Sequence, residues 1–379
     1  GEIVRISVNG SRSMPRSCGK IAITRAFLEG KLDGGDKALR HALDYCLLCK
    51  ACTEVCPNKI MTDEAMIEMR DSLGEEHGLS PKYRLIGGFM GSNGLKKLAS
   101  PAVSIAQHAR LPRLTRYLLP KNAKTPPLDH KGPALFGQGK PGASDIDLSK
   151  VKRIAYFRGC AMKLFFKNAS EASVNLLKKT GRTVEVPDVN CCGVPQQSHG
   201  LLDDARELAR HNVDLLADYD LIVTDCGSCA ATLREYGARY ADDFTMRAKA
   251  AQVSGKVMSL SEYLSAVGYH PTPHEDLRVT YHASCHLNRG LGVMAQPEAL
   301  LEEAVTYLPA AHKDMCCGGA GTFQVDFPEI SNKVLRKKCE DFEATGADIV
   351  VAECPSCLMQ LGKMEAMSGL RVMHISQVL

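Results

Sequence analysis

A duplicated set of five cysteines is the feature that most constrains this chain. Each set contains one isolated cysteine, then a Cys-Cys-Gly segment, then a Cys-x-x-Cys pair. The sets are Cys160, Cys191, Cys192, Cys226 and Cys229, and Cys285, Cys316, Cys317, Cys354 and Cys357. Corresponding cysteines lie 125 or 128 residues apart. A period that recurs at five positions, with similar apolar segments around them, indicates a duplicated structural unit.

Each unit alternates short apolar segments with longer helical patterns. In the first unit we expect strands at 153–157, 182–186 and 221–224, and helices at 164–179 and 201–217. The same order begins again near residue 277. This alternation predicts an α/β fold with mainly parallel strands. In such sheets sites form beyond the carboxyl ends of strands, and the expected strands lead directly to Cys160, Cys226, Cys285 and Cys354.

A second cysteine pattern precedes the repeat. Cys46, Cys49, Cys52 and Cys56 are followed by Pro57, with the spacing of bacterial ferredoxins that bind [4Fe–4S] clusters. Zinc sites favour two separated Cys-x-x-Cys pairs instead. Either Cys56 completes a local cluster, or a second run belongs upstream of Gly1. Cys18 is either an ordinary thiol or a ligand that reaches this region from a distance. We expect helices at 21–28 and 63–73.

Metal binding explains these cysteines better than disulfides do. The chain has 16 cysteines in 379 residues, a lower density than in small disulfide-bonded scaffolds. No secretory signal is visible, so clustered cysteines favour metal ligands. No apolar run of about 18 residues is present, and the sequence therefore predicts no membrane span.

Five thiols per unit exceed the four that a cubane cluster needs. Adjacent side chains in extended backbone point to opposite sides, so each Cys-Cys pair suits two separated irons. We therefore expect one or two further clusters in two equivalent sites, either non-cubane or with one exchangeable ligand. Gly193 and Gly318 would let backbone N–H groups approach the sulfurs. The four nearby histidines are alternative ligands, hydrogen-bond partners of a sulfur, or ordinary core and surface residues; they are His199, His282, His286 and His312. Cys339 is interpreted as a spare thiol.

The charge distribution is uneven. Residues 1–150 carry 23 Lys and Arg against 15 Asp and Glu, whereas residues 151–379 carry 24 against 28. Residues 80–140 contain 11 basic side chains and one acidic, Asp129. We expect helices at 83–90, 95–109 and 111–119, and a Pro- and Gly-rich linker at 120–150. The basic segment is either a solvated surface, a dock for a partner, or a peripheral contact with an anionic membrane.

These patterns divide the chain into four parts. They are a mainly helical ferredoxin-type domain at 1–79, a basic helical segment with a linker at 80–150, and two cysteine-rich α/β modules at 151–270 and 271–379. No dinucleotide, flavin or Walker motif is legible, and no aromatic pattern supports nucleic-acid binding. We assign no catalytic residue.

The motifs resemble those of a known family. The paired modules resemble the cysteine-rich CCG domains of heterodisulfide reductase catalytic subunits. Together with the ferredoxin run, and with Met14-Pro15-Arg16 and Phe27-Leu28-Glu29-Gly30, they resemble the iron–sulfur subunits of glycolate oxidase and D-lactate dehydrogenase. The iron–sulfur subunit of anaerobic glycerol-3-phosphate dehydrogenase is similar. That family usually has two ferredoxin runs, and one is present here, which implies a truncated chain.

The resemblance implies an electron relay without its own substrate-oxidising site. The expected partners are an FAD-containing dehydrogenase subunit and a quinone or another redox subunit. The expected location is the cytoplasm, peripheral on the inner face of the membrane. Both Cys-x-x-Cys pairs are intact, as in heterodisulfide reductase, so a catalytic disulfide reductase is the alternative. A zinc-stabilised scaffold is the third hypothesis.

Overall fold

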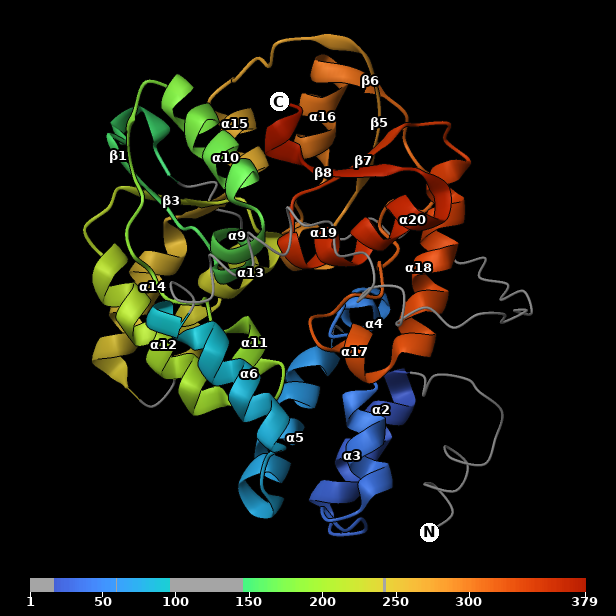
Figure 1. Cartoon of the computed structure of the whole chain (residues 1–379). Helices are drawn as coiled ribbons and strands as arrows, with labels where there is room; N and C mark the ends of the chain where they lie inside the picture. The colour runs from blue at the N-terminus through green and yellow to red at the C-terminus, as the bar shows by residue number, and fades with distance from the viewer. Residues whose placement is uncertain (1–16, 59, 96–145, 241–242) are drawn as a thin grey trace.

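The computed structural model describes residues 17–58, 60–95, 146–240 and 243–379 (Figure 1). The helices expected at 95–109 and 111–119, and most of the expected linker, lie outside these ranges. Within them, N-terminal helices precede two four-stranded sheets. Figure 1 shows the green-to-yellow first unit and the orange-to-red second unit side by side, with most of the blue helices below them.

The first unit is built on a parallel sheet of order β2-β1-β3-β4. Its strands are β1 (Arg153–Tyr156), β2 (Thr183–Glu185), β3 (Leu221–Thr224) and β4 (Val257–Ser259). Its helices are η1 (Leu148–Lys150), α9 (Cys160–Phe165), α10 (Lys167–Lys179), α11 (Val194–Gln197), α12 (Leu202–Leu216), α13 (Gly227–Arg234), η2 (Tyr236–Tyr240), α14 (Phe244–Gly255) and α15 (Leu260–Ala266).

The second unit repeats this topology as β6-β5-β7-β8, again parallel. Its strands are β5 (His274–His282), β6 (Val305–Tyr307), β7 (Ile349–Ala352) and β8 (Arg371–His374). Its helices are η3 (His286–Gly290), α16 (Ala295–Ala304), α17 (Phe323–Asp326), α18 (Pro328–Glu343), α19 (Pro355–Leu361), η4 (Gly362–Met364), α20 (Glu365–Ser368) and η5 (Ile375–Gln377).

Burial explains why these segments form central strands. Every residue of β3 and of β7 is buried, as expected for parallel strands covered on both faces, which read as continuous apolar runs. The expected α/β fold with parallel strands is therefore confirmed. One expectation is wrong: the helix expected at 164–179 is two helices. Phe166 has φ −127° and ψ 48°, outside the helical region, and separates α9 from α10.

The two units face each other with reciprocal contacts. Helix α13 of the first unit packs on η3 of the second, and the corresponding α19 packs on α9. Likewise α10 packs on η5, and α16 packs on α15. Exchange of equivalent contacts between equivalent elements is the pattern of an approximate two-fold axis. One core cluster accordingly contains Phe157 and Ile222 of the first unit with Leu335 and Val350 of the second.

The N-terminal helices are α2 (Ser17–Leu28), α3 (Lys37–Asp44), α4 (Ala51–Val55), α5 (Thr62–His77) and α6 (Pro81–Gly91). They share a small core around Leu39 and Met66 and dock onto both units. Gln196 of the first unit donates to the carbonyl of Gly87 in α6 at 2.7 Å. Tyr45 packs edge-on against Phe327 of the second unit, with ring centroids 5.1 Å apart.

Candidate metal centre

The repeated thiols gather beyond the carboxyl ends of the strands, where the sequence places them. Cys160 opens α9 after β1, and Cys285 precedes η3 after β5. Cys226 and Cys354 occupy the N-cap positions of α13 and α19, after β3 and β7. Parallel topology brings these ends to one edge of each sheet.

Within each set, the thiols contact one another in the same order. Cys160 Sγ lies 3.4 Å from Cys191 Sγ, and further thiol contacts connect the first set in the order Cys160, Cys191, Cys192, Cys229, Cys226. The second set follows the corresponding order Cys285, Cys316, Cys317, Cys357, Cys354. The duplicated spacing therefore produces duplicated geometry.

The two sets also meet. The Cys226 and Cys354 thiols hydrogen bond to each other across the two-fold axis, so the ten thiols form one continuous line. Around this junction, Gly227 N–H donates to the Glu353 carbonyl at 2.9 Å. The equivalent Pro355 has no N–H, and His374 Nε2 instead bonds the Asp225 carbonyl at 2.9 Å. The sequence repeat predicts two separate sites, whereas the structure places the two sets in contact.

The ferredoxin-type run lies at the far end of this line. Leu48 and Lys50 have left-handed φ angles of 49° and 58°, which tighten the loop between the cysteines. Burial and the neighbouring Cys316 raise the pKa of Cys49 to about 12. Arg289 connects the loop to the second set, because its Nη1 is 3.3 Å from the Cys49 carbonyl and 3.6 Å from Cys285 Sγ. Cys46, Cys52 and Cys56 are half-buried in the same segment.

Lys50 anchors this loop in the fold. Its buried ammonium lies 2.7 Å from Asp63 in α5 and 3.4 Å from Glu235 after α13. The sequence analysis assigned no role to Lys50 or Arg289. Lys50 lies inside the ferredoxin run and Arg289 lies four residues after Cys285, and the sequence gives no further signal for either residue. Their roles depend on long-range contacts that only the structure shows.

Backbone N–H groups also point at the sulfurs. Gly318 N–H donates to Cys316 Sγ, and Cys229 N–H donates to Cys226 Sγ, both at 3.4 Å. Gly193 and Gly318 have φ angles of 95° and 82°, a region that side chains disfavour. A glycine is therefore required directly after each Cys-Cys pair.

Hydrogen bonds among the thiols lower the pKa of some of them and raise the pKa of others, such as Cys226 and Cys357. Hydrogen bonds from Cys285 and Cys317 hold the pKa of Cys316 well below its usual value, and bonds from Cys226 and Cys357 do the same for Cys354. All the cysteines whose side chains are described are free of disulfides. Buried cysteine sulfurs with N–H donors form a donor set that fits an iron–sulfur cluster.

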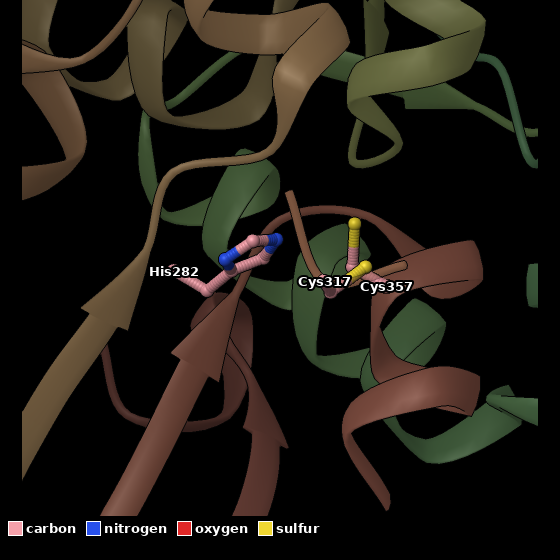
Figure 2. Close-up of side chains that lie close together, drawn as sticks. All are labelled: His282, Cys317 and Cys357. Carbon is pink, nitrogen blue, oxygen red and sulfur yellow. The ribbon is translucent and has the colours of Figure 1, made fainter. Parts of the chain in front are cut away.

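One histidine joins the thiols. Among the described residues, His282, Cys317 and Cys357 form the one group of three or more candidate ligands whose donor atoms all lie within 4.8 Å of one another. Figure 2 shows the imidazole extending from the end of β5 toward both thiols. Both ring nitrogens are buried without a hydrogen-bond partner. Burial, with Lys338 nearby, lowers the pKa of His282 to about 3.

The other candidates lie elsewhere. His199 bonds Thr322 and stacks on Tyr83, His286 bonds Ser228, and His312 is exposed. Cys339 is buried in α18 and donates to Glu343 at 3.7 Å, apart from the line of thiols. Cys18 lies in α2, and its side chain is outside the described part of the chain.

Comparisons with known proteins agree with this geometry. The model of the cysteine-rich (CCG) domain matches residues 154–234 and 279–362. Lactate utilization protein A of Shouchella clausii is 34% identical over 60% of this chain and 98% of that protein. The probable glycolate oxidase iron–sulfur subunit of Bacillus subtilis is 28% identical over 95% of this chain and 86% of that protein. A hypothetical protein from Helicobacter pylori superposes with a TM-score of 0.56 at 9% identity, covering 100% of this chain and 70% of that one, and so shares the fold.

Two parallel sheets, each with thiols beyond the carboxyl ends of its strands, define a protein with paired cysteine-rich CCG domains. The similarity extends along 98% of the length of lactate utilization protein A, and it identifies one family within this class. The chain belongs to the family of lactate utilization protein A and the glycolate oxidase iron–sulfur subunit. None of its described helices is long and apolar enough to span a bilayer.

Proposed function

We propose that this chain is the iron–sulfur electron-transfer subunit of a flavin-dependent 2-hydroxy-acid dehydrogenase complex, acting on glycolate or D-lactate. The observation that carries the proposal is the continuous line of thiols that runs from Cys49 through the second set to the first set. Iron–sulfur clusters exchange single electrons and suit such a path. The names of the relatives point to the same activity.

In this proposal all three cysteine groups bind iron. Residues 1–79 are a ferredoxin-type domain, 80–150 a basic connecting segment, and 151–270 and 271–379 the two modules. Arg289 holds the ferredoxin loop against the second set, and Lys50 holds it against the first unit through Glu235. These contacts favour a single connected path over isolated clusters.

An electron-relay subunit needs one partner that supplies electrons and another that accepts them. The complex needs an FAD-containing subunit to oxidise the hydroxy acid, and a quinone or another redox protein to accept the electrons. We also propose a cytoplasmic location with a peripheral contact on the inner face of the membrane. That contact would use residues 80–140, of which the described part includes α6. Helix α6 packs on the first unit through Gly87. Its Arg84 is exposed, whereas Lys82 forms an ion pair with Asp326 of the second unit.

The first experiment measures iron, acid-labile sulfide and absorbance near 400 nm in anaerobically purified protein. We expect Cys226→Ser to lower the iron content and slow electron transfer from an added flavoprotein. The matched control is Cys339→Ser, because Cys339 is also buried but lies outside the line. Stoichiometric zinc without sulfide would contradict the proposal, and so would equal behaviour of the two variants.

A disulfide reductase is the second candidate, because Cys226 and Cys354 meet at the centre of the line. We expect the reduced isolated chain to leave small heterodisulfides intact, and to support hydroxy-acid oxidation only with a flavoprotein present. Rapid stoichiometric disulfide cleavage that is lost in Cys192→Ser or Cys317→Ser would favour the reductase.

A further inference from the structure

The two duplicated units have different ring side chains at an equivalent position beside the thiols. Phe157 follows the buried Tyr156 at the end of β1, and His282 follows the buried Tyr281 at the end of β5. Both residues are fully buried, and both lie 125 residues apart, like the cysteines that follow them. The first unit therefore has a hydrocarbon ring where the second has two nitrogen atoms.

The imidazole of His282 has no hydrogen-bond partner in the part of the chain that the structure describes. Its Nδ1 and Nε2 are both buried and unbonded, and a buried polar group without a hydrogen bond destabilises the fold. Phe342 presents an edge-on ring 6.3 Å away, and that ring offers no hydrogen-bond acceptor in its plane. The other buried histidine of this unit, His374, has partners for both nitrogens. Of the two buried histidines that the structure describes in this unit, only His282 is thus unsatisfied.

The thiols of Cys317 and Cys357 are the candidate co-ligands. One ring nitrogen of His282 lies within 4.8 Å of both sulfurs (Figure 2). A metal ion placed among the three groups could therefore satisfy the nitrogen that the fold leaves unbonded. A neutral imidazole with thiolates is a donor set that iron accepts in iron–sulfur clusters.

We propose that His282 is a nitrogen ligand of the iron–sulfur cluster held by the second cysteine set, so that this cluster has mixed thiolate and imidazole ligation. The first set, with Phe157 at the equivalent position, keeps thiolate ligation alone. This proposal rests on the proposed function, because it assumes iron at the second set. It makes the two halves of the duplicated site chemically different.

The two clusters should also differ in reduction potential. With the neutral imidazole of His282 taking the place of one of the five thiolates as a ligand, the cluster of the second set has one anionic ligand fewer, and histidine ligation of this kind raises the reduction potential of a cluster. The cluster of the second set therefore has the higher potential of the two. The second set also lies against Cys49 of the ferredoxin run, so electrons held in the modules collect on the side that faces this run.

The test uses the full chain, purified anaerobically after labelling its histidines with ¹⁵N. Pulsed electron paramagnetic resonance of the reduced protein should show strong nitrogen coupling of a directly bound imidazole. The coupling should be lost in His282→Phe, which copies the residue of the first unit. It should persist in His286→Gln, the matched control, because His286 is near Cys354 but bonded to Ser228. A further variant, His282→Cys, should lower the potential of one cluster in a redox titration.

Several results would overturn the proposal. Iron and sulfide at full content with weak or no histidine coupling would show that His282 does not bind iron. Strong coupling that survives in His282→Phe would assign the nitrogen to another residue. If His282→Phe does not fold, the labelled wild-type protein decides alone. Absence of iron and sulfide would overturn the proposed function itself, which is a separate outcome.

Discussion

Replacing Gly318 with alanine should destabilise the protein more than any comparable glycine substitution near the thiols. Gly318 has φ +82°, and a Cβ there would lie 2.8 Å from the Ser331 carbonyl oxygen. That oxygen belongs to the backbone of α18 and cannot rotate away. The left-handed backbone costs alanine about 1–2 kcal/mol and overpacking about 1–3 kcal/mol more, which gives roughly 2–5 kcal/mol in all.

The assay is anaerobic guanidinium unfolding of the cluster-loaded protein, followed by circular dichroism and by cluster absorbance. Gly321→Ala is the matched control, because it has φ +60° but no atom within 4 Å of the added Cβ. Gly321→Ala should lower the free energy of unfolding by about 1–2 kcal/mol. Gly193→Ala should fall between the two, since its Cβ would lie 3.3 Å from Ala205. Equal losses for Gly318→Ala and Gly321→Ala would refute the steric argument.

Three further predictions concern charged groups. Lys50→Met should lower the free energy of unfolding by about 3–5 kcal/mol, because it leaves the Asp63 carboxylate buried without its cation. Adding Asp63→Asn should recover part of this loss. If Asp63→Asn does not reduce the loss, the buried ion pair is not its cause. Burial lowers the pKa of His199 from 6.5 to about 4, so the unfolded state binds the proton at a higher pH than the folded state does. The free energy of unfolding should therefore fall, by up to about 1.4 kcal/mol per pH unit, as pH drops from 6.5 to 4. Urea unfolding at pH 7 and pH 5 should show this fall, and His199→Phe should make it smaller. Arg289→Gln removes a positive charge beside Cys285 and should lower a cluster potential in a redox titration, whereas Arg289→Lys should keep it; equal potentials in both variants would exclude an electrostatic role.

Local pattern was enough to predict much of the fold. The buried strands β3 and β7, and the helices that open at Cys226 and Cys354, follow from apolar runs that end at cysteines. The break at Phe166 was not predictable, because the apolar spacing continues across it and only the backbone angles differ.

The site was predictable as a set of residue types but not as one assembly. The 125-residue period gives two equivalent thiol sets, yet it carries no information on how the units face each other. The contact between Cys226 and Cys354 depends on packing between residues 128 apart in sequence. The sequence does not separate His282 from the three other candidate histidines, whereas the structure does, through its unbonded nitrogens and its position beside Cys317 and Cys357.

The reciprocal packing of the two units has a consequence for how they can differ. Two identical chains could make the same contacts, because an isologous interface closes on itself. Such a homodimer would depend on protein concentration and would carry the same residue on both sides of its axis. A single chain makes the association intramolecular and allows Phe157 on one side with His282 on the other. Covalent fusion is therefore the feature that allows a symmetric scaffold to hold an asymmetric pair of sites.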